Sequence, residues 1–343
     1  MAWHCAVRTH ARPYVVYVHE RRDIEVRARG QGKAVVALPD PEDLYTLDAD
    51  LPELASPVML YNLDGFIDAG APGALVTEHL LSALEHRALA TFDVDRLIDY
   101  RSRRPLMIFV KDHWESYDPP ELVLYLVQDA NGTPFLMLTG PEPDHEWERF
   151  LAAVLGLVKR LKVRAAVGFH GIPMAVPHTR PLGITAHATR PELVAGYRPF
   201  LNRVQVPGSA SALLELRLGE SGHDAIGFAV HVPHYLAQAP YPAAAVTALE
   251  AVIAATGLAL PVSPLRERAE RADAEITRQV EGSDEIRSLV RALEEQYEAS
   301  AGASERDSLL SDDSGRLPTA EELAAQFEQF LAQQDRGGED PEI

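Results

Sequence analysis

The chain of 343 residues has almost no cysteine and no long apolar run. Its one cysteine, Cys5, leaves no intramolecular disulfide and too few thiols for a cysteine-based zinc or iron–sulfur site. A chain without disulfides is typical of a reducing compartment, so we predict a cytoplasmic protein. A run of about 18 apolar residues is missing, and the N-terminal region lacks the apolar block of a signal peptide. We therefore expect neither a membrane span nor secretion.

Basic residues are scarce relative to acidic ones. The chain has 32 Lys+Arg against 51 Asp+Glu, a formal net charge of −19. Residues 266–343 hold 9 Lys+Arg and 21 Asp+Glu, a difference of −12, so most of the excess acid lies near the C-terminus. Binding to phosphate backbones needs a basic face, and this balance argues against nucleic acid as a partner.

The common catalytic and cofactor motifs are absent as well. The chain has no dinucleotide glycine fingerprint, no phosphate loop with Lys-Ser/Thr, and no His-Glu-x-x-His. Ser209 and Ser211 stand in Gly-Ser-Ala-Ser-Ala rather than in Gly-x-Ser-x-Gly, so we expect them to begin or cap a structural element. We predict no cofactor, no metal site and no catalytic residue that a motif identifies.

Between residues 56 and 260, apolar segments with strand spacing alternate with segments of helical spacing. This order predicts an α/β fold in which a mixed sheet has helices on both faces, in three α/β/α layers. Helices are expected around Val76, Phe150 and Ala243, and a hairpin turn is expected at Asn131-Gly132. The expected strands are Val58–Tyr61, Leu106–Val110, Leu122–Val127, Pro134–Leu138, Ala165–Phe169, Ile184–Thr189, Leu213–Leu218 and Ala225–Val230.

Composition shifts divide the chain into five segments. We expect a weakly ordered N-terminal extension over residues 1–39 and an α/β core over residues 40–262. A helical extension follows over residues 263–298, and a flexible linker rich in Ser, Asp and Gly is expected over residues 299–317. Residues 318–343 are predicted to form an amphipathic helix with an acidic tail.

That last helix is the predicted partner-binding element. Thr319 and Glu322 have the spacing of a capping box, which marks a helix N-terminus. Apolar side chains then recur at i, i+4, i+7 and i+8 on one face. They are Leu323, Phe327, Phe330 and Leu331. Such a face must be buried against its own domain, a neighbouring copy or another protein.

Three polar loops at strand ends are candidate sites. In the first, Asp64 and Asp68 stand between a strand and a helix, where open α/β sheets place ligand loops. They would bind a metal or act as a base, or they would serve only as turn and cap residues. The second loop contains His170, His178 and Arg180, which would hold an anion or shuttle a proton. The structural alternative is a rigid, proline-rich connection.

The third loop carries His231, His234 and Tyr235 after a predicted strand. His231 and His234 would converge with His178 as three nitrogen ligands, but no recognised ligand spacing supports a metal there. We expect His187, on a separate extended stretch, to be a strand histidine with its hydrogen bonds satisfied.

Together these segments resemble a known family. The residues from Leu60 to Gly70, the Gly171–Pro181 loop and the Val230–Leu236 stretch followed by Tyr241-Pro242 are similar to the family of the second proteasome assembly chaperone (PAC2-like), in its bacterial uncharacterised branch. The resemblance implies a phosphorylase/hydrolase-like α/β/α fold, a scaffold that binds proteasome α-subunits, and oligomerisation. It implies no catalytic residues. The chain ends in Ile343 rather than in the family's tyrosine-containing docking tail.

Two functions follow as expectations. The first is a non-enzymatic, homo-oligomeric protein-binding scaffold with proteasome subunits as a further partner, and with neither nucleic acid nor membrane as a partner. The alternative is a small-molecule-binding protein or a hydrolase/phosphorylase-like enzyme that uses a cleft where the three polar loops meet. In that alternative, Arg180 and His178 hold a phosphate.

Overall fold

The computed structural model describes residues 39–198 and 203–309, and it contains one large mixed sheet, a separate hairpin and seven α-helices within those residues. Residues up to Ser288 form one compact unit and the next begins at Leu289. The strands are β1 (Tyr45–Leu47), β2 (Val58–Asp64), β3 (His86–Phe92), β4 (Met107–Val110), β5 (His113–Tyr117), β6 (Val123–Gln128), β7 (Pro134–Pro141), β8 (Ala165–Met174), β9 (Ile184–Ala188) and β10 (Asp224–Pro233). The helices are α1 (Pro72–Ala83), α2 (Val94–Leu97), α3 (Trp147–Arg160), α4 (Ala210–Glu220), α5 (Pro242–Thr256), α6 (Ser263–Glu281) and α7 (Asp284–Leu309), with 3₁₀ turns at Pro41–Leu44, Pro191–Val194 and His234–Leu236.

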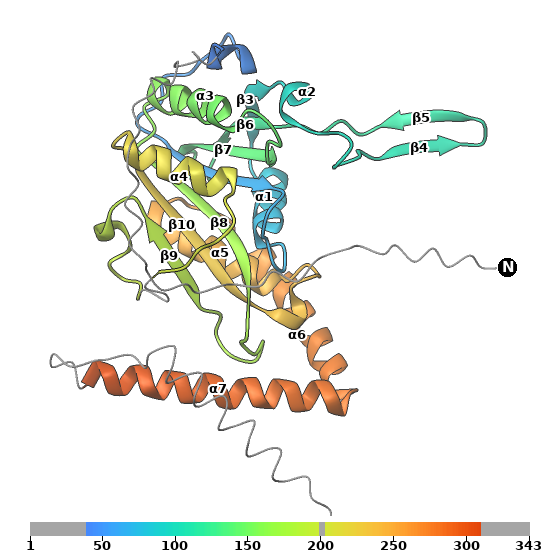
Figure 1. The fold of residues 1–343 in the computed structure, drawn as a ribbon, viewed down its shortest axis with the longest axis vertical. Coiled ribbons are helices and arrows are strands. Elements are labelled where there is room, and N and C mark those ends of the chain that lie inside the picture. The colour runs from blue at the N-terminus through green and yellow to red at the C-terminus, as the bar shows by residue number, and fades with distance from the viewer. Residues whose placement is uncertain (1–38, 199–202, 310–343) are drawn as a thin grey trace, which may run out of the picture. The chain divides into compact units, whose positions relative to one another are not determined.

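The large sheet has eight strands in the order β1-β3-β6-β7-β2-β8-β10-β9 (Figure 1). Strands β7, β2, β8 and β10 run parallel to one another, whereas β1, β3, β6 and β9 pair antiparallel with their neighbours. The sheet is therefore mixed, and the predicted α/β fold is confirmed.

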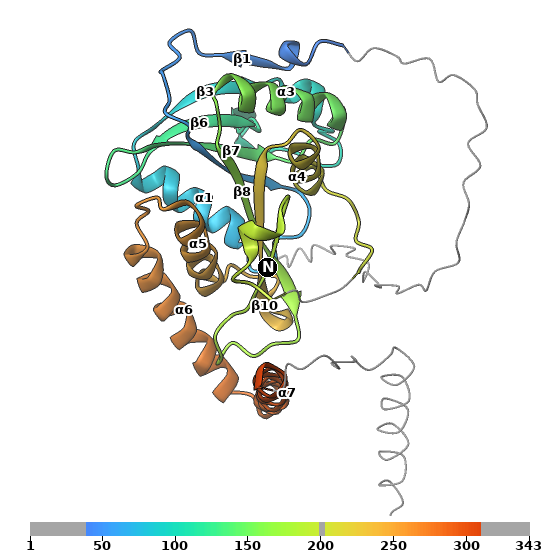
Figure 2. The same cartoon turned by 90° about the vertical axis from the view of Figure 1, so that its left-hand side faces the viewer.

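Helices cover both faces of this sheet (Figure 2). Central strand β2 is buried on both faces, because successive side chains alternate between them. Met59 and Tyr61 belong to a core that includes residues of α3 and α4. Val58 and Leu60 belong to a second core that includes residues of α1 and α5. This is the three-layer arrangement expected from the sequence.

The C-terminal helices differ from the expected segments at one boundary. Helix α6 packs along α5, and its Leu265 and Ala269 are buried. Helix α7 continues to Leu309, so residues 299–309, expected as the start of a flexible linker, are helical. Residues 1–38 of the extension predicted over residues 1–39, and the predicted helix at Leu323, Phe327, Phe330 and Leu331, lie outside the described residues.

One predicted strand is wrong. Leu213–Leu218 lies within helix α4, which begins after Ser209, whose Oγ accepts a hydrogen bond from the Ala212 N–H at 3.1 Å. Leucine alternates with charged residues there, which suggests a strand period of two. The buried residues instead recur at helical spacing, at Leu214 and Leu218, whereas Leu216 is 55% exposed.

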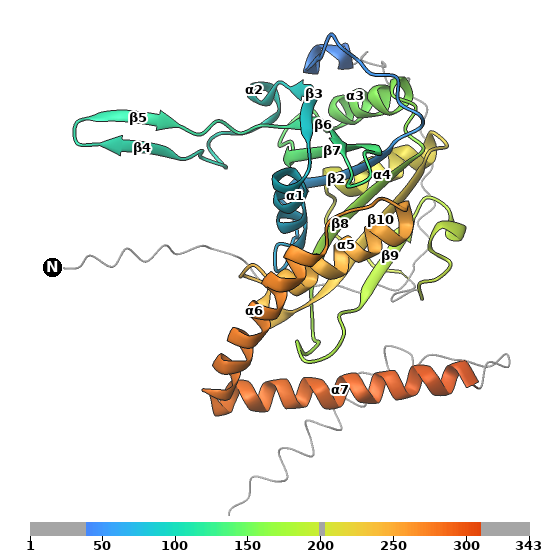
Figure 3. The same ribbon diagram turned by 180° about the vertical axis from the view of Figure 1, so that it is seen from behind.

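The strand expected at Leu106–Val110 exists but lies outside the large sheet. Among the strands that the structure describes, β4 pairs only with β5, and the two form an exposed hairpin that Figure 3 shows extending from the rest of the α/β unit. Strand β3, which sequence analysis did not identify, takes a place in the sheet between β1 and β6. None of the described helices combines the length and the hydrophobicity that a membrane span requires.

Candidate functional site

A pocket of about 320 Å³ opens on the α4 side of the sheet. Its walls come from the loop that follows β2, from the end of β7, from strands β8, β9 and β10, and from the first turns of α4. It is a place where several strand ends and a helix N-terminus meet, as is common for ligand sites of α/β proteins.

The floor of the pocket is one row of residues across four adjacent strands. The strand register aligns Tyr61 with Gly168, Gly168 with Gly227, and Gly227 with His187. A Cβ at Gly168 would lie 2.6 Å from the Tyr61 ring, and a Cβ at Gly227 would lie 2.0 Å from the His187 ring. Each glycine therefore makes room for the ring of its neighbour. A glycine inside a strand often marks such a close approach, and this is the signal that sequence analysis did not use.

His187 connects strand β9 to helix α4. Its Nδ1 lies 2.9 Å from Oε1 of Glu215, and the Glu215 side chain is largely buried. The sequence predicts His187 to be a strand histidine with its hydrogen bonds satisfied, and its pattern does not single out Glu215, because it predicts a strand over Leu213–Leu218. The pair forms one side of the pocket.

His170 lies two residues after Gly168 on β8, so both residues are on the same face of the sheet. It pairs in register with Ala229 of β10, and both residues line the pocket. Burial and the nearby His187 lower the pKa of His170 to about 4, so the ring is neutral at pH 7. Within the described residues, neither ring nitrogen of His170 has a hydrogen-bond partner. A neutral imidazole there offers one donor and one acceptor.

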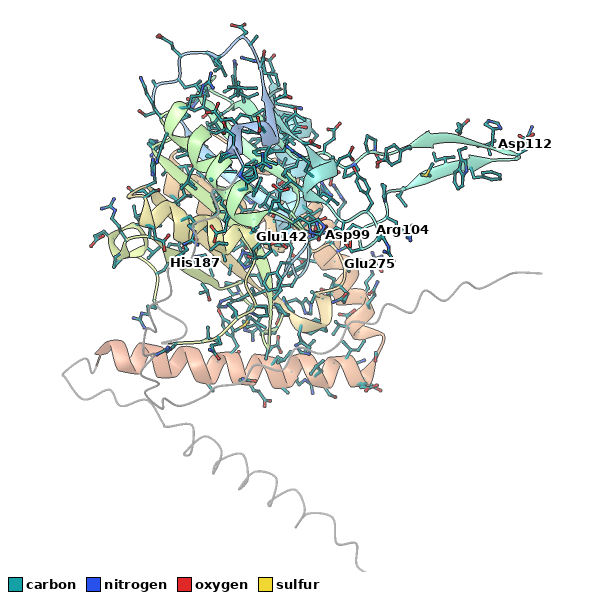
Figure 4. All side chains as sticks on the ribbon, turned by 45° about the horizontal axis from the view of Figure 1, so that its top comes forward. Asp99, Arg104, Asp112, Glu142, His187 and Glu275 are labelled. Carbon is teal, nitrogen blue, oxygen red and sulfur yellow. The ribbon has the colours of Figure 1, made fainter. Side chains whose placement is uncertain are left out.

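Glu142, which sequence analysis missed, follows strand β7 and lies within the α/β unit in Figure 4. It is only 7% exposed, and its Oε1 accepts a hydrogen bond from the Ala210 N–H at the start of α4. Burial raises the pKa of Glu142, although the Ala210 N–H and the Arg103 guanidinium counteract part of this effect. Within the described part of the chain, Oε2 has no hydrogen-bond partner.

The two predicted aspartates hold the first loop together. Asp68 accepts hydrogen bonds from the N–H groups of Gly73 and Ala74 at 3.2 Å, and from Gly171 at 2.9 Å. It therefore caps α1 and ties that helix to β8. Burial raises the pKa of Asp68, against the effect of these three N–H groups. The Asp64 side chain is exposed. Both aspartates line the pocket.

The other candidates of the second and third loops do not line the pocket. The Tyr235 hydroxyl lies 2.8 Å from both the backbone N and the Nδ1 of His178. The His234 ring packs edge-on against the Tyr235 ring, with 5.5 Å between centroids. Arg180 donates a hydrogen bond to the Thr179 carbonyl. The three predicted loops are thus divided between the pocket and a separate His178–Tyr235 contact.

His231 points to a different neighbour. Its Nε2 lies 2.8 Å from Oγ1 of Thr185 on β9, and burial lowers its pKa. Across the described ranges, no three His, Cys, Asp or Glu side chains stand close enough to hold a metal ion. The described residues that line the pocket include neither Lys nor Arg, so the phosphate site expected from Arg180 and His178 is not formed there.

The sequence profile of the PAC2 family matches residues 62–280, which include every residue that lines the pocket except Tyr61. No curated protein matches the chain.

Solved structures with the same fold agree with this match. The Mycobacterium tuberculosis protein Rv2714, of unknown function, is 48% identical with a TM-score of 0.76, and the match covers 79% of this chain and 94% of that one. A Corynebacterium glutamicum protein of unknown function is 39% identical with a TM-score of 0.72, over 75% of this chain and 97% of that one. The Mycobacterium tuberculosis proteasome-assembly chaperone homologue Rv2125 is 22% identical with a TM-score of 0.63, over 68% of this chain and 99% of that one.

Proposed function

Because the chain belongs to the PAC2 family, we propose that it is a non-enzymatic protein-binding scaffold that associates with copies of itself. The observation that carries this proposal is the β4–β5 hairpin, whose large apolar side chains face solvent. They are Leu106, Met107, Ile108, Phe109, Trp114 and Tyr117.

The exposure of these side chains is unusual for a monomer. Leu106 is 78% exposed and Trp114 is 62% exposed, and the six residues lie within one short hairpin. Contiguous apolar patches of this kind mark protein–protein interaction sites, because leaving them in water costs free energy. The apolar surface of the hairpin therefore supports a role in protein contacts.

The hairpin has little support from the rest of the molecule. Figure 4 shows Asp112 at its far tip and Arg104 near its base. The rings of Phe109 and Trp114 contact each other at 5.1 Å between centroids, on two strands that pair with no third strand of the described ranges. A two-stranded hairpin alone is only marginally stable in water, and a partner surface would stabilise it.

A second copy of this chain is the partner we propose for the hairpin. An apolar surface that must be covered at all times needs a partner present in equal amount, and another copy meets that condition by itself. Charged side chains beside the apolar ones, including Lys111, Asp112 and Glu115, would form a polar rim.

Proteasome subunits are the further partner that we propose. The basis is the name of Rv2125, a proteasome-assembly chaperone homologue with the same fold. We propose that the predicted C-terminal helix, with Phe327 and Phe330 on its apolar face, contributes to this contact. The single cysteine supports a cytoplasmic location.

Self-association is tested by changing the hairpin in the full chain. We expect the wild type to be an oligomer of fixed mass by light scattering and analytical ultracentrifugation. The triple variant Ile108→Thr, Phe109→Thr, Trp114→Thr keeps β-propensity but removes apolar surface, and we expect a monomer. Leu216→Gln, at an exposed leucine of α4, is the control and should keep the wild-type mass. A monomeric wild type, or an unchanged mass in the triple variant, would contradict the proposal.

The proteasome contact is tested separately with purified proteasome α-subunits. We expect the full chain to bind them in a pull-down, and the variant Phe327→Ser, Phe330→Ser to lose that binding without a change in oligomer mass. If the wild type does not bind, proteasome subunits are not the partner, whereas the hairpin experiment still decides self-association.

A further inference from the structure

The pocket presents two polar groups that the described residues leave without a hydrogen-bond partner. They are Oε2 of Glu142 and the ring nitrogens of His170, none of which has a hydrogen-bond partner within the described residues. Among the described residues, the buried polar atoms without a partner are Thr77 Oγ1 and Asp273 Oδ1, so Glu142 Oε2 and the His170 nitrogens remain accessible from the cavity. Both groups line the same cavity, so a molecule bound there has both as hydrogen-bond partners within its site.

The charges of the lining residues indicate the sign of the charge that a bound molecule would carry. Four carboxylates line it, those of Asp64, Asp68, Glu142 and Glu215, and the described lining residues include no Lys or Arg. Arg103 is a nearby cation, but its guanidinium donates to the Asp64 carbonyl at 3.1 Å and to Asp144 at 2.9 Å. His170 is neutral at pH 7. An anion would therefore meet carboxylates without a cation to hold it, whereas a cation would be attracted.

The remaining walls are apolar. Side chains of Phe66, Ile67, Ile172, Val206 and Pro207 line the cavity beside the polar groups. A cavity of about 320 Å³ with mainly apolar walls and a few placed polar groups suits a small organic molecule. A bare metal ion does not suit it, because apolar walls cannot replace the hydration shell and no three-ligand group exists among the described residues.

We propose that this pocket binds a small organic cation, a primary amine on a compact apolar body. The ammonium group of the amine would donate one hydrogen bond to the Glu142 carboxylate and another to a ring nitrogen of His170. The charge-assisted hydrogen bond to Glu142 would supply most of the selectivity, and the apolar walls would bury the body. This site is independent of the hairpin, so its test and that of self-association have separate outcomes.

Three probes of equal size and different charge test the proposal. They are phenethylamine, 2-phenylethanol and phenylacetate, titrated into the full chain at pH 7 in an isothermal titration calorimeter. We expect phenethylamine to bind at least about tenfold more tightly than 2-phenylethanol, and phenylacetate not to bind. Equal or tighter binding of phenylacetate, or no binding of phenethylamine at millimolar concentration, would overturn the proposal.

The variant Glu142→Gln tests whether the carboxylate of Glu142 is the charge that selects the amine. Glutamine keeps a carbonyl oxygen for the Ala210 N–H, so the start of α4 stays capped while the charge is removed. We expect phenethylamine to bind at least about tenfold more weakly, with binding of 2-phenylethanol unchanged. Glu85→Gln, at an exposed carboxylate outside the pocket, should leave both affinities unchanged.

A second variant tests the place of binding without a change in charge. Ala212 is an exposed α4 residue that also lines the pocket, so Ala212→Trp would fill space with little effect on folding. We expect it to abolish phenethylamine binding. Wild-type affinity in both Glu142→Gln and Ala212→Trp would show that the amine binds elsewhere, and would overturn the assignment of this pocket.

Discussion

The hydroxyl of Tyr235 lies 2.8 Å from two atoms of His178, the backbone N and the ring Nδ1. The two residues are 57 positions apart in the chain, and their rings also meet edge-on at 5.9 Å between centroids. One side chain thereby fastens the long loop that follows β8 to the turn that follows β10.

We expect Tyr235→Phe to lower the free energy of unfolding by about 1–2 kcal/mol, because it removes both hydrogen bonds and keeps the ring. Urea denaturation followed by circular dichroism measures this. Tyr125→Phe is the control, since that hydroxyl has no hydrogen bond within the described residues, and it should change stability by less than about 0.5 kcal/mol. Equal effects of the two substitutions would show that the hydroxyl of Tyr235 does not stabilise the fold.

Asp129 stabilises the turn between β6 and β7. Its carboxylate accepts hydrogen bonds from the N–H groups of Asn131 at 2.9 Å, Thr133 at 2.8 Å and Ala259 at 2.9 Å. We expect Asp129→Ala to cost about 3 kcal/mol of stability at pH 7, because three N–H groups lose a charged acceptor. Chemical denaturation measures the loss, with Glu85→Ala as an exposed control.

The same residue predicts a pH dependence. Burial acts to raise the pKa of Asp129, but the three N–H bonds outweigh it and the pKa lies below its usual value. The stability that Asp129 contributes is therefore present above the unfolded pKa, and it is lost as pH falls through the lower folded pKa. The difference between wild type and Asp129→Ala should shrink from pH 6 to pH 3. A constant difference would contradict the pKa direction.

Gly227→Ala should destabilise the protein by about 2–3 kcal/mol. The new methyl group would lie 2.0 Å from the His187 ring, so the ring must leave its place. In the double variant with His187→Ala, the methyl group has room, and we expect the second substitution to recover part of the loss. The control is Gly156→Ala in α3, where nothing lies within 4 Å and the helix gains propensity. Additive effects of the two substitutions would argue against the contact.

The stability contributed by Asp273 on α6 is expected to change with pH in the opposite direction to that contributed by Asp129. Its Oδ1 is buried without a hydrogen-bond partner in the part of the chain that is described. Burial raises the pKa of Asp273, while His178 and the Tyr241 hydroxyl act to lower it. Between the unfolded and the folded pKa, the native state binds the extra proton, so the stability contributed by this group falls as pH rises through that window.

We therefore expect Asp273→Asn to be more stable than wild type at pH 7, since asparagine keeps an oxygen for Tyr241 but never ionises. Thermal unfolding at pH 7 and at pH 3.5 should show that the gain becomes small in acid. Asp50→Asn, at an exposed site, should show no gain at either pH. A gain of equal size at both pH values would show that ionisation of Asp273 is not its cause.

The local periodicity of apolar residues was enough to predict the three layers of the fold. The strands β2, β6, β7 and β8 and helix α3 lie where their apolar patterns predict, because each pattern of burial repeats within its own segment. The pattern did not decide α4, where Leu214, Leu216 and Leu218 fit a strand period and a helix must be chosen by which faces are buried. It also did not show that β4 pairs away from the main sheet, since an apolar strand looks the same in either place.

The sequence by itself thus determined the types of most elements, with α4 and β3 as exceptions, and the polar loops at strand ends, including Asp68 and His170. Only the tertiary structure decided which of these share a site. Tyr61, Gly168, Gly227 and His187 form one row because four strands pair in a particular register, and register between distant segments is not contained in the pattern of any one of them. For the same reason Glu142 and Glu215 became visible as pocket residues only when β7 and α4 were placed beside that row.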